Sequence, residues 1–392
     1  MTSPRWQIAF LLAGVCLLVA LDLSRHGVAP VAARAVIPVA NLSPIGSKLV
    51  LKNQGHLPMP PDTPAAHASN LLAMPPGHPC ALMAFWFAGE RESAPDVQIA
   101  TSCFERASQQ WTAAKFVVNR HETGKLLGYG IRRLGNPVAW LDPARRIHLF
   151  VVATGPGGWA ASRLLHVRQA EVDSNADTPV FSEPRVLPLS WLWNVSHLAR
   201  GAPLPLEDGG MVLPAYFELG VKYPLALRFD RAGEFRGMTR MSDRQAILQP
   251  TLIALNATHW LALMRDNRLE GKIAVAQTGD GGHSWRDLRD LNLSNPDASI
   301  SAATLGPWHF MLAHNSSPKS RRALDLSESG NGVDWTRILT LATGSDVSDG
   351  EITKAAEFSY PAMEWADGSL WVMYTENRKR IAWQRFMMEK SP

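Results

Sequence analysis

The sequence predicts an all-β protein, a six-bladed β-propeller preceded by one N-terminal hydrophobic helix. Three observations lead to this fold class: a composition that suits short strands, a strand pattern that recurs six times, and a turn motif in phase with those strands. The composition has 14 Trp against 5 Tyr, with 29 Gly and 28 Pro, as expected for many short strands separated by turns. With 46% apolar residues among 392, the chain can also build a globular core.

The first element is a hydrophobic targeting segment. Arg5 precedes an apolar run over residues 6–21, and Asp22 and Arg25 close it. The run is shorter than the roughly 20 residues of a membrane span. Two interpretations stay open: a signal peptide cleaved at the small residues 33–35 (Ala-Arg-Ala), or an uncleaved signal anchor. Both export the rest of the chain, either anchored in the inner membrane and facing the periplasm, or secreted or periplasmic.

The propeller is expected at residues 65–388, after the targeting segment (1–35) and a Pro-rich lead-in (36–64). Each repeat has an apolar strand, a short turn, a second apolar strand that ends in polar residues, and a third strand. The second strands begin at Ala81, Ile147, Met211, Trp260, Trp308 and Leu370. The third strands cover residues 97–104, 162–169, 225–230, 273–279, 322–329 and 380–386. A spacing of roughly 50 to 65 residues per unit is that of four-stranded blades.

Residues 278–285 (Thr-Gly-Asp-Gly-Gly-His-Ser-Trp) carry the sharpest local motif, an Asp-box. Its defined positions are Thr278, Asp280, Gly282 and Trp285. The Asp side chain can bind nearby backbone amides, Gly accepts a positive φ, and the Trp is expected to be buried beneath the hairpin. A weaker copy has Ser327, Gly332 and Trp335, with Gly330 at the Asp position. Both motifs are structural rather than catalytic.

The three cysteines are Cys16, Cys80 and Cys103. Cys16 lies inside the apolar run. Cys80 and Cys103 bracket two apolar stretches that a hairpin would bring together, so we expect them on adjacent strands of the first blade. A disulfide or two buried free thiols both fit.

Charge and ligand spacing exclude two classes of partner. The net charge of +4 is scattered, with Lys and Arg interleaved with Asp and Glu, so no nucleic-acid footprint is expected. The histidines are dispersed and have no companion ligands at metal-binding spacing. We therefore expect no metal and no other cofactor.

Several short motifs occur in an order that resembles the bacterial sialidase-like family of BNR (Asp-box) repeats, over roughly residues 64–386. They are Ala66-His67-Ala68-Ser69, residues 88–97 (Ala-Gly-Glu-Arg-Glu-Ser-Ala-Pro-Asp-Val), Gly135-Asn136-Pro137-Val138, Gln249-Pro250-Thr251 and residues 357–362 (Glu-Phe-Ser-Tyr-Pro-Ala). The resemblance implies a sialidase-like propeller that holds a glycan at the mouth of its funnel.

True sialidases of this fold grip a carboxylate with three arginines, use an Asp as acid/base, and use a Tyr paired with a Glu as nucleophile. By resemblance, Arg91 and Asp96 match a substrate-binding arginine and the acid/base. Arg265 resembles an arginine of the triad, and Arg322 or its neighbour Arg321 is a further candidate. Such a clamp favours an acidic sugar as ligand.

The chain also departs from the family pattern. His67 stands where the first triad arginine is expected, and it is either a hydrogen-bonded structural residue or a catalytic base. Phe358 stands where the nucleophilic Tyr should precede Ser359, and Tyr360 is expected on the opposite strand face. Gln249 lies near the place of the partnering Glu, while Glu218 lies one blade earlier.

The remaining site candidates come from the propeller geometry. We expect the second strands to run near the central channel, so that polar residues at their ends line one funnel. These are Glu90, Arg91, Glu92, Glu218, Arg265, Asn315 and Glu376. Asn136 and Gln249 are further substrate-binding candidates, and Trp191 and Trp193 could stack on sugar rings. For catalysis we predict Asp96 as the acid, with Glu218 or Tyr360 as its partner.

Three functions remain open. The first is an exported glycoside hydrolase of the sialidase-like type that acts on an acidic glycan. The second is a non-catalytic carbohydrate-binding propeller of a cell-surface polysaccharide system. The third is a lyase of a uronate polysaccharide. In each case the expected partner is a glycan or acidic polysaccharide, with the membrane as a second partner if the N-terminal segment is uncleaved.

Overall fold

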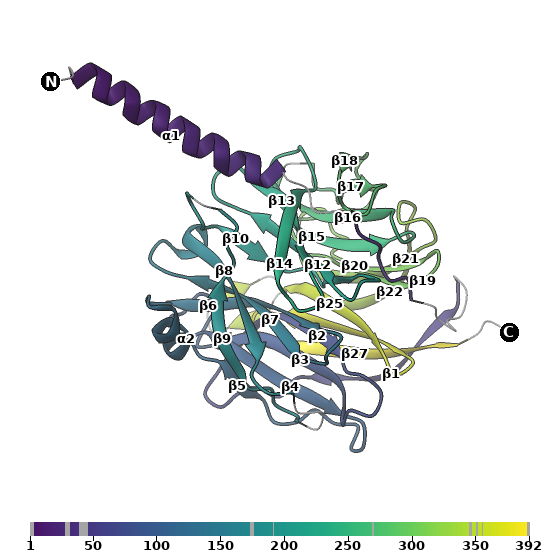
Figure 1. Cartoon of the computed structure of the whole chain (residues 1–392). Coiled ribbons are helices and arrows are strands. Elements are labelled where there is room, and N and C mark those ends of the chain that lie inside the picture. The colour runs from purple at the N-terminus through teal and green to yellow at the C-terminus, as the bar shows by residue number, and fades with distance from the viewer. Residues whose placement is uncertain are drawn as a thin grey trace.

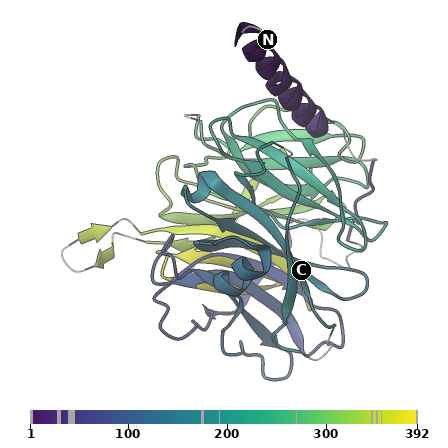
Figure 2. The same cartoon turned by 60° about the vertical axis from the view of Figure 1, so that its left-hand side comes forward.

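The computed structural model describes residues 4–27, 32–38, 46–172, 176–190, 192–268, 270–344, 347–349, 352–354 and 356–389. Over these residues the chain forms six antiparallel sheets arranged as the blades of a propeller (Figures 1 and 2). The predicted fold class is confirmed. Trp191 lies outside the described residues.

Blades 1 to 3 take up the first half of the ring. Blade 1 has β2 (Ala65–Ala73), β3 (Cys80–Gly89), β4 (Gln98–Glu105) and β5 (Lys115–Val118). Blade 2 has β6 (Arg133–Leu141), β7 (Ile147–Thr154), β8 (Ser162–Gln169) and β9 (Phe181–Val186). Blade 3 has β10 (His197–Ala199), β12 (Met211–Phe217), β13 (Tyr223–Phe229) and β14 (Phe235–Arg240), with β11 (Leu204–Pro205) beside β12.

Blades 4 to 6 complete the ring. Blade 4 has β15 (Ile247–Ala254), β16 (Trp260–Asp266), β17 (Ala274–Thr278) and β18 (Arg286–Asp287). Blade 5 has β19 (Ser301–Gly306), β20 (His309–His314), β21 (Ala323–Ser329) and β22 (Thr336–Thr343). Blade 6 has β25 (Phe358–Ala366), β26 (Ser369–Glu376), β27 (Arg380–Glu389) and β1 (Lys48–His56). A hairpin of β23 (Val347–Asp349) and β24 (Ile352–Lys354) lies outside the blades.

Helix plays a small part. The long α1 (Pro4–Gly27) is the expected N-terminal helix and projects from the propeller in Figure 1. The sequence did not indicate the short α2 (Arg120–Leu127) or the 3₁₀ turn at Gly158–Ala161. In α2 the Asn119 side chain caps the first turn, and Gly128 ends the helix with φ 73°.

Blade 6 closes the ring with a strand from the other end of the chain. β1 pairs antiparallel with β27 from Lys48 opposite Glu389 to His56 opposite Ala382. This strand lies inside residues 36–64, which the sequence presented as a lead-in. The lead-in is therefore part of the propeller, because the C-terminal blade supplies only three strands of its own.

The first strand of each blade, and not the second, lies at the central channel. Sheet order runs from β2 outward to β5 and from β6 outward to β9, and β2 lies against both β6 and β25. The expectation that second strands line the channel is wrong. Second strands lie between two neighbours in the sheet and between two blades, so every residue of β3 and of β7 is buried.

The Asp-box at residues 278–285 forms the expected hairpin. The Thr278 hydroxyl accepts the Gly282 amide (3.0 Å), and the Asp280 carboxylate accepts the Ser284 amide (2.9 Å). The Trp285 indole donates to the Gly282 carbonyl at 3.3 Å, but its ring is only partly buried against the core of the blade. It therefore covers the edge of the blade rather than lying fully beneath the turn.

The second Asp-box keeps Gly332 and Trp335 but uses different residues at its Ser and Asp positions from those expected. Ser329, rather than Ser327, accepts the Gly332 amide at 2.9 Å. Asn331, rather than Gly330, takes the role of the Asp and accepts the Asp334 amide at 2.8 Å. The Trp335 indole donates to the Gly332 carbonyl at 3.0 Å, as in the first box.

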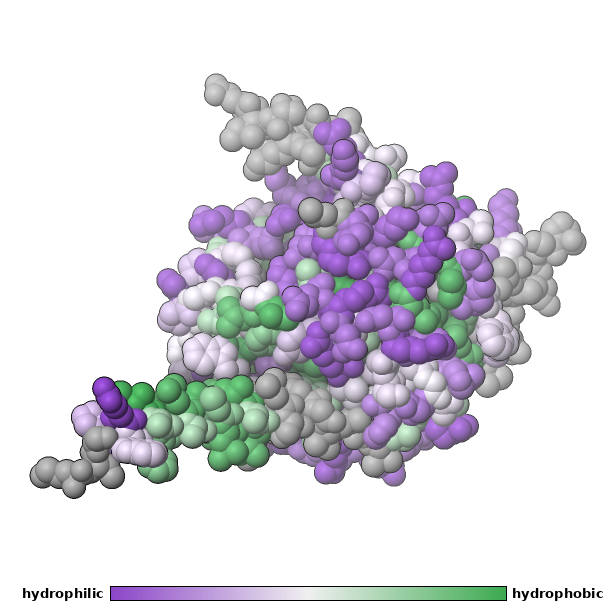
Figure 3. Space-filling view, turned by 90° about the horizontal axis from the view of Figure 1, so that it is seen from above, coloured by the Kyte–Doolittle hydropathy of each residue, from purple (hydrophilic) through white to green (hydrophobic). Residues whose placement is uncertain are grey.

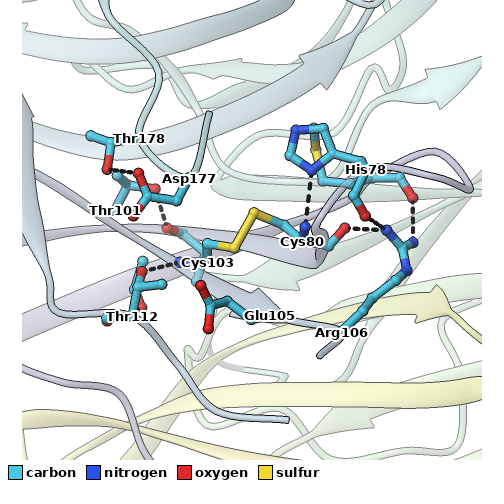
Figure 4. Close-up of a disulfide and its surroundings, with 12 residues drawn as sticks. His78, Cys80, Thr101, Cys103, Glu105, Arg106, Thr112, Asp177 and Thr178 are labelled. Atoms are coloured by element: carbon cyan, nitrogen blue, oxygen red, sulfur yellow. Dashed lines mark hydrogen bonds between the residues drawn. A yellow bond between two sulfur atoms is a disulfide. The ribbon is translucent and has the colours of Figure 1, made fainter. Parts of the chain in front are cut away.

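Cys80 on β3 and Cys103 on β4 form a disulfide, with their Cα atoms 5.6 Å apart (Figure 4). The prediction that they lie on adjacent strands of blade 1 is confirmed, and they are bridged rather than free. The Arg106 guanidinium lies beside the bridge and donates to the carbonyl oxygens of Cys80 and Met74 (Figure 4). It thereby ties the turn that precedes Cys80 to the turn that follows Cys103.

Candidate functional site

Four first strands carry a bulge at the same end of the propeller, which we call the site face. The register breaks between His67 and Asn70, Gly135 and Val138, Leu248 and Thr251, and Ser359 and Ala362. Within these breaks φ is 53° at Ala68, 44° at Asn136, 46° at Gln249 and 54° at Tyr360. A bulge inserts one residue and turns its side chain. Four of the five short motifs seen in the sequence therefore contain these bulges, which aim side chains at the mouth of the channel.

Tyr360 reaches the site because of its bulge. Simple alternation along β25 would place Tyr360 on the same face as Phe358, two residues earlier. Instead its hydroxyl lies 3.4 Å from Nε2 of Gln249, whereas Phe358 packs into the core between blades 5 and 6. The tyrosine of the site is Tyr360.

Gln249 is the centre of a buried polar network. Its Nε2 donates to the hydroxyls of Tyr216 (3.3 Å) and Tyr360 (3.4 Å), and its Oε1 accepts from Arg265 at 3.1 Å. Arg265 also donates from Nε to Asp297 at 2.6 Å. The network joins blades 3, 4, 5 and 6, and each Gln249 amide atom is oriented by a partner.

Glu218 lies just beyond Tyr216 at the end of β12. It is half-buried, and burial raises the pKa of its carboxyl group, although Lys222 and Arg265 act in the opposite direction. A carboxyl group whose pKa is raised at the edge of a polar site is suited to act as an acid.

A second network surrounds Glu357. Its carboxylate accepts from Arg321 (3.0 Å), Arg378 (2.9 Å) and the Ser359 hydroxyl (2.8 Å). Burial opposes the charge, but these bonds lower the pKa of Glu357 to about 2. Arg378 also pairs with Glu92 of blade 1, so this network closes the gap between blades 6 and 1.

Arg200 lies beneath Tyr360 and is 3% exposed. It donates to the carbonyl oxygens of Tyr360 (2.8 Å) and Pro361 (2.9 Å), and its guanidinium lies 5.3 Å from the centroid of the tyrosine ring. Burial lowers the pKa of Arg200 to about 10, which leaves it charged at neutral pH. Its two bonds are to backbone carbonyls, so neither neutralises the charge.

His67 lies on the other side of Tyr360, with ring centroids 4.2 Å apart. It is 2% exposed, and neither ring nitrogen has a hydrogen-bond partner among the described residues. Burial, together with the charges of Arg378 and Arg200, holds the pKa of His67 well below its usual value. His67 is therefore a neutral imidazole at the floor of the site, beside a gap that is too small to hold a water molecule and that Arg91, Glu92 and Arg378 also line.

The remaining predicted residues are placed as follows. Arg91 and Asp96 are exposed in the loop after β3, and Asp96 accepts the Glu90 amide at 2.8 Å. Arg321 rather than Arg322 faces the Glu357 network, and Arg322 is exposed. Asn136 is 5% exposed at its bulge.

Two predicted funnel residues have structural contacts instead. Asn315 is fully buried and donates to the carbonyls of Ala323 and Phe358, so it fastens blade 5 to blade 6. Glu376 pairs with His56 and Arg380 beside the closing strand β1. Neither side chain is free to contact a ligand in this arrangement.

Five residues of the site were not singled out from the sequence: Arg200, Tyr216, Asp297, Glu357 and Arg378. Glu357 stood inside the quoted motif 357–362 and could have been found there. The others have no local signature, since their roles depend on which blades meet. No group of three or more potential metal ligands occurs among the described residues.

A family model described as a BNR repeat-like domain matches residues 80–379. The chain belongs to this family. Solved structures of sialidases share its fold. A search of curated proteins finds no match.

Three solved structures illustrate the likeness of this BNR-repeat propeller to others. The Hadza microbial sialidase Hz136 superposes with a TM-score of 0.65 at 17% identity, covering 82% of this chain and 65% of that one. The Trypanosoma rangeli sialidase in complex with sialic acid gives 0.64 at 13% identity, covering 88% and 59%. A protein of unknown function from Dyadobacter fermentans gives 0.65 at 10% identity, covering 88% and 100%. The chain thus spans about three-fifths of the length of these sialidases and shares their fold.

Proposed function

We propose that this BNR-repeat propeller is a glycoside hydrolase that acts on a glycan carrying an acidic group. The observation that supports it best is the meeting of Tyr360, Gln249, Tyr216 and Arg265, from three blades, at the mouth of the channel. The side chains of Gln249, Tyr216 and Arg265 are buried or nearly so. Hydrogen bonds among the four residues fix the orientation of their polar atoms. Such pre-ordered polar groups on a rigid scaffold are typical of a site that binds and positions a ligand.

The acidic preference rests on Arg200. The other arginines of the site are paired with carboxylates of the chain: Arg265 with Asp297, Arg321 and Arg378 with Glu357. Arg200 contacts backbone carbonyls and the Tyr360 ring, and it adds a positive charge at the floor of the site. A buried uncompensated cation favours an anionic ligand above it.

Hydrolysis here would not follow the tyrosine and glutamate scheme expected from the family resemblance. Gln249 donates to the Tyr360 hydroxyl, and an amide cannot remove the phenolic proton. Glu218 is the better candidate acid, since burial raises its pKa. Asp96 is the second carboxyl group to test, although it lies on an exposed loop.

The same contact favours a second candidate function. If no group replaces the missing base, the site binds a glycan without cleaving it. The exposed Trp193, in the loop before β10 at the site face, offers a ring on which a sugar could stack.

The experiment compares turnover and binding in one set of variants. The full chain is assayed on α-sialosides, on glucuronides and on uronate-containing oligosaccharides, with products identified by mass. We expect Glu218→Gln to lower turnover by roughly 10²-fold or more, as for loss of an acid/base group. The matched control is Trp308→Ala, an exposed residue at the turn between β19 and β20.

Each outcome separates the alternatives. Glycan binding without turnover in the unmutated chain would support the binding function, and an unsaturated uronate product would indicate elimination. Turnover that is unchanged in Glu218→Gln, Asp96→Ala and Tyr360→Phe would place the chemistry elsewhere. Neither binding nor turnover on any acidic glycan would overturn the proposal.

A further inference from the structure

The N-terminal helix is built to cross a bilayer. Over Pro4–Leu21 its mean hydropathy is 1.8, and none of this window is buried against the propeller. This 18-residue apolar window is about 27 Å long at 1.5 Å per residue, slightly less than a hydrocarbon core of about 30 Å. Figure 3 shows its apolar side chains as a continuous green rod beside a mostly hydrophilic propeller surface.

The segment that follows the helix is docked on the propeller. We call residues 33–37 the clip. Its backbone bonds run from Ala33 N to Gly281 O (3.1 Å), from Ala35 N to Ala257 O (2.7 Å), from Val36 N to Pro205 O (3.0 Å) and from Glu207 N to Arg34 O (2.8 Å). Ala33 is 5% exposed and Ala35 is fully buried, within the core shared by blades 3 and 4.

The clip coincides with the small residues at which a signal peptidase was expected to cut. Cleavage after Ala35 would remove Ala33 to Ala35 from the core of the folded protein. Gly281 shows how closely the two parts fit, because a Cβ atom there would lie 2.0 Å from the Ala33 carbonyl oxygen. The folded propeller therefore uses the residues that a cleaved signal peptide would discard.

The clip and the functional site lie at opposite ends of the same strands. On β15, Gln249 lies near the site face, and the chain reaches the clip contact at Ala257 eight positions later. On β16, Arg265 lies at the site end, and Trp260 lies at the clip end, next to that same turn. Five steps of about 3.3 Å separate Arg265 from Trp260, so the two faces lie about 17 Å apart along this strand.

The connector between helix and clip is short. Only residues 28–32 lie between Gly27 and Ala33, so six residue steps separate these two residues and reach at most about 22 Å when fully extended. The clip contacts are therefore held within that distance of the end of α1. The Cys80–Cys103 disulfide is consistent with a propeller on the oxidising side of a membrane.

We propose that the chain keeps α1 as an uncleaved membrane anchor, and that the clip fixes the propeller with its clip face toward the lipid bilayer and its site face away. The ligand would then approach from the side opposite the membrane. This inference does not depend on what the site does, so it can fail or succeed separately from the proposed function.

The first test is the mass of the full chain recovered from expressing cells. We expect the intact N-terminus, with the protein kept in the membrane fraction after alkaline carbonate washing. A recovered chain that begins at or after residue 28 would overturn the anchor.

The second test measures orientation in lipid vesicles. Fluorophores are attached to Cys at His283 or at Glu270, in a Cys16→Ser background. Both positions are exposed in blade 4, His283 at the clip face and Glu270 at the site face. We expect headgroup-attached quenchers to quench the His283 probe several-fold more than the Glu270 probe. Equal or reversed quenching would overturn the orientation.

The third test opens the clip. Gly281→Ala places a Cβ atom against Ala33, so trypsin should cut after Arg34 and release the propeller several-fold faster than from the unmutated chain. Gly368→Ala is the matched control, because Gly368 has a similar φ of 69° and no atom within 4 Å of the added Cβ. If trypsin released the propeller at the same rate from the unmutated chain, Gly281→Ala and Gly368→Ala, the clip would not be what protects Arg34 from cleavage.

Discussion

The Arg200 guanidinium of blade 3 donates to the carbonyl oxygen of Tyr360 in blade 6, on the far side of the ring, at 2.8 Å. It also donates to Pro361 at 2.9 Å, so one side chain spans the channel and holds the bulge that presents the Tyr360 hydroxyl. The positive φ of Tyr360 frees these carbonyls from the strand ladder. Arg200 is therefore a positioning residue for the site.

Arg200→Met should destabilise the protein by about 3 kcal/mol, because two buried carbonyls lose charged donors. Urea unfolding followed by tryptophan fluorescence measures this change. Arg200→Lys should recover part of the loss, since both bonds come from the single nitrogen Nη2 and an ammonium group also has several N–H donors on one nitrogen. Equal stability of Arg200→Met and the unmutated protein would show that these bonds contribute nothing.

Tyr360→Phe separates a role in the site from a role in folding. The variant removes one hydroxyl with a long 3.4 Å bond to Gln249, so its unfolding free energy should fall by less than about 1 kcal/mol. Glycan turnover or affinity should fall by a larger factor than this small loss of stability can explain. The matched control is Tyr374→Phe in the same blade, whose hydroxyl accepts from Gln384 at 3.3 Å outside the site.

If both tyrosine variants lower activity equally, the effect of Tyr360→Phe is structural. If neither Tyr360→Phe nor Tyr374→Phe lowers activity, the Tyr360 hydroxyl does not contact the ligand. Only a loss confined to Tyr360→Phe places this hydroxyl in the site.

The apolar repeat predicted the second and third strands well because these strands are buried on both sides and read as continuous apolar runs, as in β7. The first strands were harder to interpret. A bulge adds one residue and interrupts the alternation, so counting by twos from Phe358 does not give the side on which Tyr360 lies. The pairing of β1 with β27 could not be predicted either, since it joins residues more than 300 positions apart without a local signal.

Reducing the Cys80–Cys103 bridge should lower stability by about 3 kcal/mol, the value expected for a loop closed over 23 positions. The measurement is urea unfolding of the Cys80→Ala/Cys103→Ala double variant, compared with the oxidised protein. The same variant treated with reductant should show no further change. A stability loss on reduction that persists in the double variant would have another source.

The last prediction concerns a buried chain of three polar groups between blades 2 and 3. His148 Nδ1 lies 2.9 Å from His166 Nε2, and His148 Nε2 lies 3.1 Å from the Asp142 carboxylate. Burial holds the pKa of His166 well below its usual value, so the folded protein keeps this imidazole neutral. The unfolded chain binds a proton as pH falls through about 6.5, and the folded chain does not.

Stability should therefore be fully present above about pH 6.5 and fall as the pH is lowered toward the depressed pKa of His166, by at most about 1.4 kcal/mol per pH unit for this one group. Urea unfolding at half-unit steps from pH 8 to pH 5 measures the slope. In His166→Asn the slope should be smaller, because one fewer proton is taken up on unfolding. Leu261→Ala, a core substitution in blade 4, should lower stability equally at every pH and leave the slope unchanged. A His166→Asn slope that equals that of the unmutated protein would mean that the acid sensitivity comes from other buried groups, of which His67 is the first to test.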